Sequence, residues 1–255
     1  MNLRLRYFIE LAYKGTSFHG WQIQPNAVSV QETLEKALTT LLRTPIGIVG
    51  AGRTDTGVHA KFMIAHFETE VSFDNEQLVY KLNSFLPPSI AIYKIYQVHD
   101  QAHARFDATS RAYEYWLHTQ KNPFETDSAH YIKFPIDMEK MNAAAEKLLD
   151  YTNFKCFSKS KTDVKTYNCE LFYAYWEEVT PGVLVFKISA NRFLRNMVRA
   201  IVGTLLDVGT GKILVSDIDK IIASQNRSEA GYSVPAKGLY LTNVTYPENL
   251  FLSHE

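Results

Sequence analysis

Apolar and polar positions alternate strictly along the first residues of the chain. In residues 3–13 every second position is leucine, isoleucine or tyrosine, while Arg4, Arg6 and Glu10 fall between them. Successive side chains of a β-strand point to opposite faces, so this pattern predicts a half-buried strand. The strand is expected to end at Lys14 and Gly15, because glycine is a frequent turn residue.

Helical spacing replaces this alternation at two later places. Ser29 and Glu32 have the spacing of a capping box, and apolar residues then recur every three or four positions as far as Leu42. Asp74 leads a second predicted helix, which Pro87 and the proline after it bring to an end. The apolar side of this second helix is predicted to contain Leu78, Leu82 and Phe85.

The order of the predicted elements indicates the fold. With strands at residues 46–49, 62–67 and 90–98, the first half reads β-α-β-β-α-β, which is typical of ferredoxin-like folds. The second half is predicted to repeat that order, with a short extra helix capped by Ser216. Its strands are expected at residues 111–118, 167–179, 183–190 and 239–246, and its helices at residues 138–149 and 192–208.

We therefore predict an α+β fold of two ferredoxin-like (βαββαβ) halves, residues 1–103 and 104–255. Their mostly antiparallel sheets are expected to meet at a central cleft, where ligands usually bind. Because no proline- and glycine-rich linker occurs near residue 100, we expect one continuous body instead of two independently moving domains.

Composition narrows the class of protein. The chain has 255 residues, of which 46% are hydrophobic, and its 27 Lys and Arg balance its 27 Asp and Glu, so total charge does not indicate a nucleic-acid partner. No apolar run could span a bilayer, and the start does not resemble a signal peptide, so we expect a soluble cytoplasmic protein without a membrane partner. Cys156 and Cys169 are expected to be free thiols.

The most distinctive stretch is residues 50–60, a glycine-rich loop with Asp55 near its centre. Its glycine spacing is that of a phosphate-binding P-loop, but Val58 and His59 stand where Lys and Ser or Thr are required. A simple β-turn, in which Asp55 bonds its own backbone, is the other structural interpretation. The loop lies between two predicted strands, which would hold any chemistry in place.

Three further segments carry candidate chemistry. Arg111, Tyr113 and Tyr115 share one face of a predicted strand, either as a binding surface or as an ordinary aromatic pair. Residues 155–165 contain four lysines, among them Lys159 and Lys161, and form either a solvated loop or a surface that follows RNA phosphates.

The third segment is residues 191–203. Arg192, Arg195 and Arg199 recur at helical spacing, which predicts a basic stripe along one side of a helix. Apolar residues flank Arg199, so its charge requires a partner.

Residues 52–59, Gly-Arg-Thr-Asp-Thr-Gly-Val-His, closely resemble the signature loop of the TruA-type tRNA pseudouridine synthases. Four further segments are similar to motifs of the same family and extend the resemblance over nearly the whole chain. They are residues 13–22, 104–115, 197–199 and 236–241. The chain departs from the first of these at Ile23, where a basic residue often follows in family members.

The resemblance implies a role for each matching residue. Asp55 is the expected catalytic carboxylate, Tyr113 is expected to pack on the target uracil, and Arg199 is expected to pair with Asp55. Arg53 would fill the space that the target base leaves in its stack. His59, Arg111, Leu239, Lys159 and Lys161 complete the residues that we expect at the substrate.

The same resemblance implies the reaction, which is isomerisation of uridine to pseudouridine at positions 38 to 40 of the tRNA anticodon stem-loop by a homodimer. No cofactor is expected, since the reaction changes no oxidation state, and no metal is expected, since no cluster of His, Cys and carboxylate residues suggests a metal site. Asp55 could attack the sugar, stabilise its charge or remove a sugar proton. Two alternatives are a non-catalytic RNA-binding protein with two RRM-like halves, and a nucleoside hydrolase or glycosidase, which would require a second carboxylate.

Overall fold

The computed structural model describes residues 4–159 and 164–252, and these form two compact units. One unit contains the chain up to Thr109 together with the chain from Leu241 onward, and the other is Ser110–Tyr240. Within the described residues the structure has five α-helices, and nearly all strand pairs are antiparallel. The predicted α+β class is therefore confirmed.

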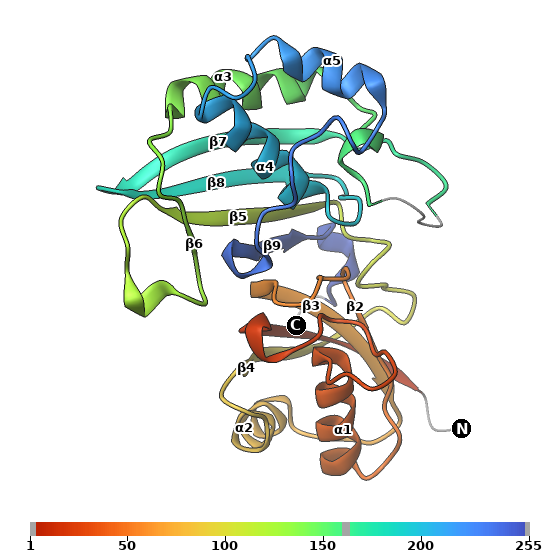
Figure 1. Cartoon of the computed structure of the whole chain (residues 1–255). Helices are drawn as coiled ribbons and strands as arrows, with labels where there is room; N and C mark the ends of the chain where they lie inside the picture. Colours follow the sequence, from red (N-terminus) through yellow and green to blue (C-terminus); the bar gives the residue numbers. More distant parts are fainter. Residues whose placement is uncertain (1–3, 160–163, 253–255) are drawn as a thin grey trace. The chain divides into compact units, whose positions relative to one another are not determined.

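The first unit has the predicted element order, β-α-β-β-α-β. Strand β1 lies between β3 and β4, and β2 pairs with the other edge of β3, all antiparallel. Figure 1 shows α1 and α2 together on one side of these strands. The elements are β1 (Leu5–Tyr13), α1 (Val30–Leu42), β2 (Ile48–Gly50), β3 (His59–Thr69), α2 (Asn75–Phe85) and β4 (Ile90–Val98).

Side-chain caps begin both helices of this unit where the sequence predicted them. Ser29 Oγ accepts a hydrogen bond from the backbone N–H of Glu32 at 3.2 Å, and Asp74 Oδ1 accepts one from that of Gln77 at 2.7 Å. Each bond satisfies a backbone donor that has no partner inside its helix. The predicted apolar side of α2 extends only to Leu82, because Phe85 is 54% exposed.

Strand β1 is more deeply buried than its alternation predicted. On one face the residues at positions 7, 9, 11 and 13 are buried, but Phe8 on the opposite face is also completely buried. Phe8 packs edge-on against Tyr246, with ring centroids 5.2 Å apart. The prediction of a half-buried strand was wrong at this position, because residues from the end of the chain cover the second face.

In the second unit β8 lies between β5 and β7 and is antiparallel to both, while the short β6 pairs in parallel with β5. Helix α3 packs on β7 and on α4, as Figure 1 also shows. The elements are β5 (Ser110–His118), β6 (His130–Tyr131), α3 (Met138–Lys147), β7 (Leu171–Thr180), β8 (Val183–Ala190), α4 (Met197–Gly209) and α5 (Asp217–Ser224). Strand β9 (Leu239–Thr245) begins in this unit and continues into the other.

Helix α4 begins five residues later than predicted, so the basic stripe does not exist. Asn196 immediately precedes the helix with φ of 69°, a left-handed conformation that a helix interior does not contain. Arg192 and Arg195 therefore lie in an irregular segment, and only Arg199 is helical. Apolar spacing alone did not reveal this interruption.

Two smaller predictions also differ from the structure. Strand β7 begins at Leu171 and not at residue 167, and Ser216 makes no side-chain cap at α5. Instead, Asp217 Oδ2 accepts the backbone N–H of Leu214 at 2.9 Å and orders the turn before the helix.

Cys156 and Cys169 are both buried and unpaired, as expected. Burial raises the pKa of the Cys156 thiol to about 12 and that of the Cys169 thiol to about 11, so both stay protonated at neutral pH. Across residues 4–159 and 164–252, no helix is both long enough and apolar enough to cross a membrane.

Gly203 in α4 provides a test of packing in the second unit. A Cβ atom at this position would lie 1.8 Å from the carbonyl oxygen of Tyr232, so Gly203→Ala must push two backbone segments apart. We expect the free energy of unfolding to fall by about 1–3 kcal/mol or more, measured by urea denaturation. Gly47→Ala is the matched control, since nothing lies within 4 Å of its added Cβ. Equal stabilities of the two variants would contradict this packing.

Candidate functional site

Asp55 lies in the loop that joins β2 to β3. The backbone N–H of Val58 donates to the carbonyl of Asp55 at 3.1 Å and closes a tight turn, while that of Ala51 donates to Ile64 at 2.8 Å and holds the loop to β3. The Asp55 side chain is half-exposed, whereas the flanking Thr54 and Val58 are buried. The loop therefore presents a carboxylate from a fixed backbone.

Thr54, the residue before Asp55, is held at two points, by the last residue of β1 and by the segment that follows this strand. Its carbonyl oxygen accepts the backbone N–H of Trp21 at 3.2 Å, and its hydroxyl bonds the hydroxyl of Tyr13 at 2.9 Å. Tyr13 and Trp21 are both nearly completely buried. Because one residue is held through both its backbone and its side chain, Asp55 has little freedom to shift along the loop.

Two glycines make this close approach possible. Gly20 adopts φ of 86°, and a Cβ there would lie 2.5 Å from the carbonyl oxygen of Thr54. A Cβ at Gly15 would lie 1.9 Å from the carbonyl oxygen of Val58. The two segments can be in contact only where side chains are absent.

His59, which the sequence placed at the substrate, has a supporting position in the structure. The residue is 2% exposed, and its Nδ1 accepts the backbone N–H of Gly15 at 3.1 Å. Trp21 is also 2% exposed, and its ring fills the space beside Gly50, where a Cβ would come within 2.5 Å of it. Trp21 is therefore a core residue.

In the second unit, Arg111 and Tyr113 at the start of β5 lie beside the segment that follows β8. Arg111 Nη1 donates to the carbonyl of Asn191 at 2.9 Å. The rings of Tyr113 and Phe193 are 5.1 Å apart and almost perpendicular. Edge-to-face contact of this kind fixes the plane of an aromatic ring while leaving part of it accessible.

Tyr115 differs from Tyr113 although both lie in β5. It is completely buried, its hydroxyl donates to the carbonyl of Pro235 at 3.0 Å, and burial raises its pKa. A Cβ at Gly238 would lie 2.8 Å from the Tyr115 ring. Leu239, the next residue, is only 6% exposed. Tyr115 and Leu239 are thus parts of the core of this unit.

Arg199 lies in the first turn of α4 with its side chain half-buried. Its Nε donates to the carbonyl of Val234 at 2.7 Å, and the backbone N–H of Val234 donates back to the carbonyl of Arg199 at 3.2 Å. This reciprocal pair fixes the guanidinium stem against the segment before β9.

Apolar residues anchor the start of the lysine-rich segment. Lys155–Phe157 forms a short 3-10 helix in which Cys156 and Phe157 are buried. The backbone N–H of Lys159 donates to the carbonyl of Arg195 at 3.0 Å. Lys161 lies outside the described residues.

The described part of the chain contains no group of three or more His, Cys, Asp or Glu side chains that could hold a metal ion. His66 illustrates the structural use of such residues: its Nδ1 accepts the backbone N–H of Ala104 at 3.1 Å. Burial, together with the nearby His103 and Arg6, lowers the pKa of His66 to about 4, which keeps it a neutral acceptor at pH 7.

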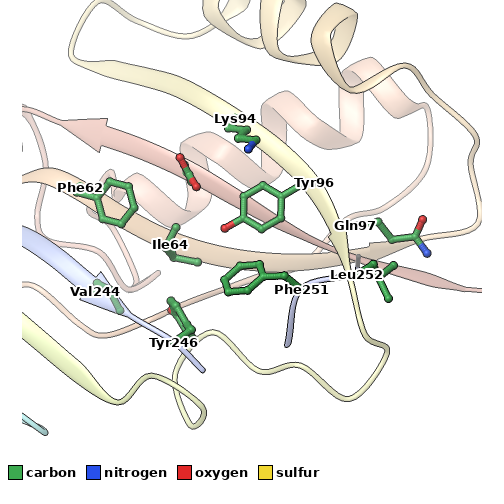
Figure 2. Close-up of a pocket in the computed structure, with 10 residues that line it drawn as sticks. Phe62, Ile64, Lys94, Tyr96, Gln97, Val244, Tyr246, Phe251 and Leu252 are labelled. Carbon is green, nitrogen blue, oxygen red and sulfur yellow. The ribbon is translucent and has the colours of Figure 1, made fainter. Parts of the chain in front are cut away.

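A cavity of about 340 Å³ lies elsewhere in the first unit (Figure 2). Tyr96, Phe251 and Tyr246 are among its lining residues, and none of the predicted site residues lines it. The sequence-based site and this cavity are therefore separate features.

The structure adds residues that the sequence analysis did not single out. Thr54 holds the loop, and Gln22 Oε1 accepts a hydrogen bond from Arg53 Nε at 3.1 Å. Thr54 and Gln22 lie within the two motifs discussed above, so only their contacts were missing from the prediction. Arg53 and Asp55 lie in the loop before β3, and His59 is the first residue of that strand, all in the first unit. Arg111, Tyr113 and Arg199 belong to the second unit.

Comparison with known proteins gives a consistent result. A family model described as tRNA pseudouridine synthase matches residues 11–107 and 144–247. The tRNA pseudouridine synthase A of Bacteroides fragilis is 53% identical over 247 residues, which cover 96% of this chain and 98% of that protein. The corresponding protein of Porphyromonas gingivalis is 52% identical and covers 97% of this chain and 99% of its own length. That of Bacillus licheniformis is 40% identical, with 95% and 99% covered.

Gly20 provides a test of how the Asp55 loop is supported. We expect Gly20→Ala to lower the free energy of unfolding by about 2–4 kcal/mol, because the left-handed conformation and the contact with Thr54 both oppose a Cβ atom. Hydrogen exchange at the Trp21 amide should also become faster. Gly211→Ala is the control, since Gly211 has φ of 74° but nothing within 4 Å of an added Cβ, and it should show the conformational cost alone. Equal losses in both variants would contradict the contact.

Proposed function

The chain belongs to the tRNA pseudouridine synthase family, and we propose that its Asp55 loop isomerises uridine to pseudouridine in the anticodon stem-loop of tRNA. The family match includes segments of both units, and the relatives align over nearly their whole length. The chain is accordingly an isomerase whose substrate is tRNA. The observation that carries the assignment of the site is a half-exposed carboxylate on a loop held at Thr54.

The reaction requires three events at one uridine. The glycosidic bond breaks, the uracil turns while it is held, and its C5 bonds to C1′ of the ribose. In this last event C5 loses its proton while N1 gains one. An ionised carboxylate at Asp55 supports any of three roles, as nucleophile toward the sugar, as stabiliser of its developing charge, or as base for a sugar proton. Each role demands a fixed position, which the two bonds to Thr54 supply.

Three other residues complete the proposed site. Tyr113, whose ring plane Phe193 fixes, packs on the uracil and keeps it in place while it turns. Arg199 pairs with Asp55 through its guanidinium, whose stem Val234 holds. Arg53, which is exposed in the same loop as Asp55, enters the space vacated by the target base and offsets part of the cost of unstacking it.

Several finer points rest on the family resemblance and are proposals of the same kind. The target uridines are those at positions 38 to 40, and a homodimer holds one tRNA across both subunits. His59, Arg111, Leu239, Lys159 and Lys161 act at the substrate or support the residues that do. The protein acts in the cytoplasm, and the halves 1–103 and 104–255 are each ferredoxin-like.

The direct test is to incubate the protein with unmodified tRNA and to map pseudouridine along the product. Pseudouridine in the anticodon stem-loop is the expected result. Unchanged tRNA, or pseudouridine formed only in other arms, would contradict the proposal.

We predict that Asp55→Asn abolishes the reaction but not folding or tRNA binding. Asparagine has nearly the same shape, and the contacts that hold the loop involve Thr54 and the backbone, so the fold should be preserved. A single-turnover rate lower by about a hundredfold or more, with an unchanged dissociation constant for tRNA, is expected. Asp100→Asn, at an exposed position after β4, is the control. Retention of most of the rate in Asp55→Asn would exclude Asp55 as the catalytic carboxylate.

We predict a graded response at Arg199. Lysine keeps the charge but loses the planar, two-pronged geometry, so Arg199→Lys should lower the single-turnover rate by roughly tenfold. Arg199→Met removes the charge as well and should lower it by roughly a hundredfold or more. Arg195→Met, at an exposed position in the segment before α4, should leave the rate unchanged at saturating enzyme. If Arg199→Met and the wild type react equally fast, Arg199 does not assist Asp55.

A further inference from the structure

Arg53 is held by a neutral partner. Its side chain is exposed, and its Nε donates to the amide oxygen of Gln22 at 3.1 Å. This bond uses Nε and not the two terminal Nη groups, which are the ones suited to a two-pronged contact with a base or a phosphate. An amide also leaves the positive charge of the guanidinium unneutralised, whereas a carboxylate partner would compensate it.

Gln22 is itself the outer member of a chain of hydrogen bonds. Its Nε2 donates to Gln31 Oε1 at 3.0 Å, and Gln31 Nε2 donates to Glu35 Oε1 at 3.0 Å. Gln31 and Glu35 are one helical turn apart in α1. Gln31 donates its amide N–H to Glu35 and accepts from Gln22, and Gln22 donates to Gln31 and accepts from Arg53. Because a carboxylate can only accept, Glu35 fixes the orientation of both amides.

The inner end of the chain is tied to the strand that leads into the Asp55 loop. Gln31 Nε2 also donates to the carbonyl of Ile48 at 3.0 Å, and the backbone N–H of Ile48 donates to Glu35 Oε1 at 2.9 Å. Ile48 is the first residue of β2. The backbone N–H of Ile23 donates to Gln31 Oε1 at 3.2 Å. Helix α1, β2 and the segment after β1 are thus joined at Gln31.

We propose that Gln22, oriented by Gln31 and Glu35, is a positioning residue that holds Arg53 ready to contact the substrate. The inference rests on the proposed function, since it gives Arg53 a role at the target base. A long arginine side chain in water samples many rotamers, and fixing it beforehand reduces the entropy lost on binding. Because Gln22 is exposed, its bonds contribute little to stability, and their effect is expected on Arg53.

A double-mutant cycle tests whether Gln22 acts through Arg53. Single-turnover rates are measured on unmodified tRNA for the wild type, Gln22→Leu, Arg53→Met and the double variant. We expect Gln22→Leu to lower the rate by roughly threefold to thirtyfold, and the double variant to be no slower than Arg53→Met alone. Gln24→Leu is the matched control in the same segment. Gln24 Nε2 donates to the carbonyl of His19 and takes no part in the hydrogen bonds that link Gln22 to Glu35.

A second pair of variants separates positioning from a general structural role. Gln22→Glu keeps an oxygen acceptor for Arg53 but adds a negative charge that pairs with the guanidinium. We expect weaker tRNA binding and a log K versus log[salt] slope reduced by about one, as in Arg53→Met. Gln31→Leu should slow the reaction like Gln22→Leu, with no further loss when Arg53 is already methionine.

Additive losses in the cycle, or a Gln22→Glu slope equal to that of the wild type, would overturn this inference while leaving the proposed function intact. Failure of the wild-type protein to form pseudouridine would instead overturn the proposed function. The melting temperatures of all variants are measured together with the rates, to show whether each variant folds. Should Gln22→Leu fold poorly, the Gln22→Glu and Gln31→Leu arms decide the outcome.

Discussion

The two hydrogen bonds to Thr54 are the interaction on which the proposed site depends. A catalytic carboxylate in a glycine-rich loop faces opposing demands, because the glycines that let the loop approach a substrate also allow it to move. The Trp21 amide and the Tyr13 hydroxyl resolve this conflict by holding the residue before Asp55 through its backbone and its side chain. Tyr13 ends β1 and Trp21 lies in the segment that follows it. Both are nearly completely buried, so they give the Asp55 loop its rigidity.

This arrangement explains why glycines recur in two separate segments. Gly15 and Gly20 lie opposite the backbone of the Asp55 loop, where any Cβ would collide with a carbonyl oxygen. Gly50 makes room for the Trp21 ring on the other side. Residues 13–22 and the Asp55 loop are therefore packed directly against each other. A larger side chain at one of these glycines would displace the backbone of the opposite segment through van der Waals contact.

Prediction from the sequence worked best where one local rule decides the structure. The caps at Ser29 and Asp74 and the strand over residues 90–98 were placed correctly, because a side-chain oxygen or a period of two determines each. It was wrong where tertiary contacts or an unusual backbone angle override the pattern. Phe8 is buried by residues from the far end of the chain, and Asn196 takes a left-handed conformation where apolar spacing suggested a continuing helix.

The candidate site shows the same difference between local sequence patterns and tertiary contacts. Asp55, Tyr113 and Arg199 were proposed from contiguous motifs, whereas the hydrogen bonds that hold the site join residues up to 80 positions apart. Gln22 illustrates the limit, since its motif was evident but its connection through Gln31 to Glu35 depends on how α1 meets β2. A motif therefore specifies which chemical groups are available, and the contacts around it determine how much freedom each group keeps. For Arg53, which is proposed to enter a base stack, that freedom sets the entropy lost on binding as much as its charge sets the attraction.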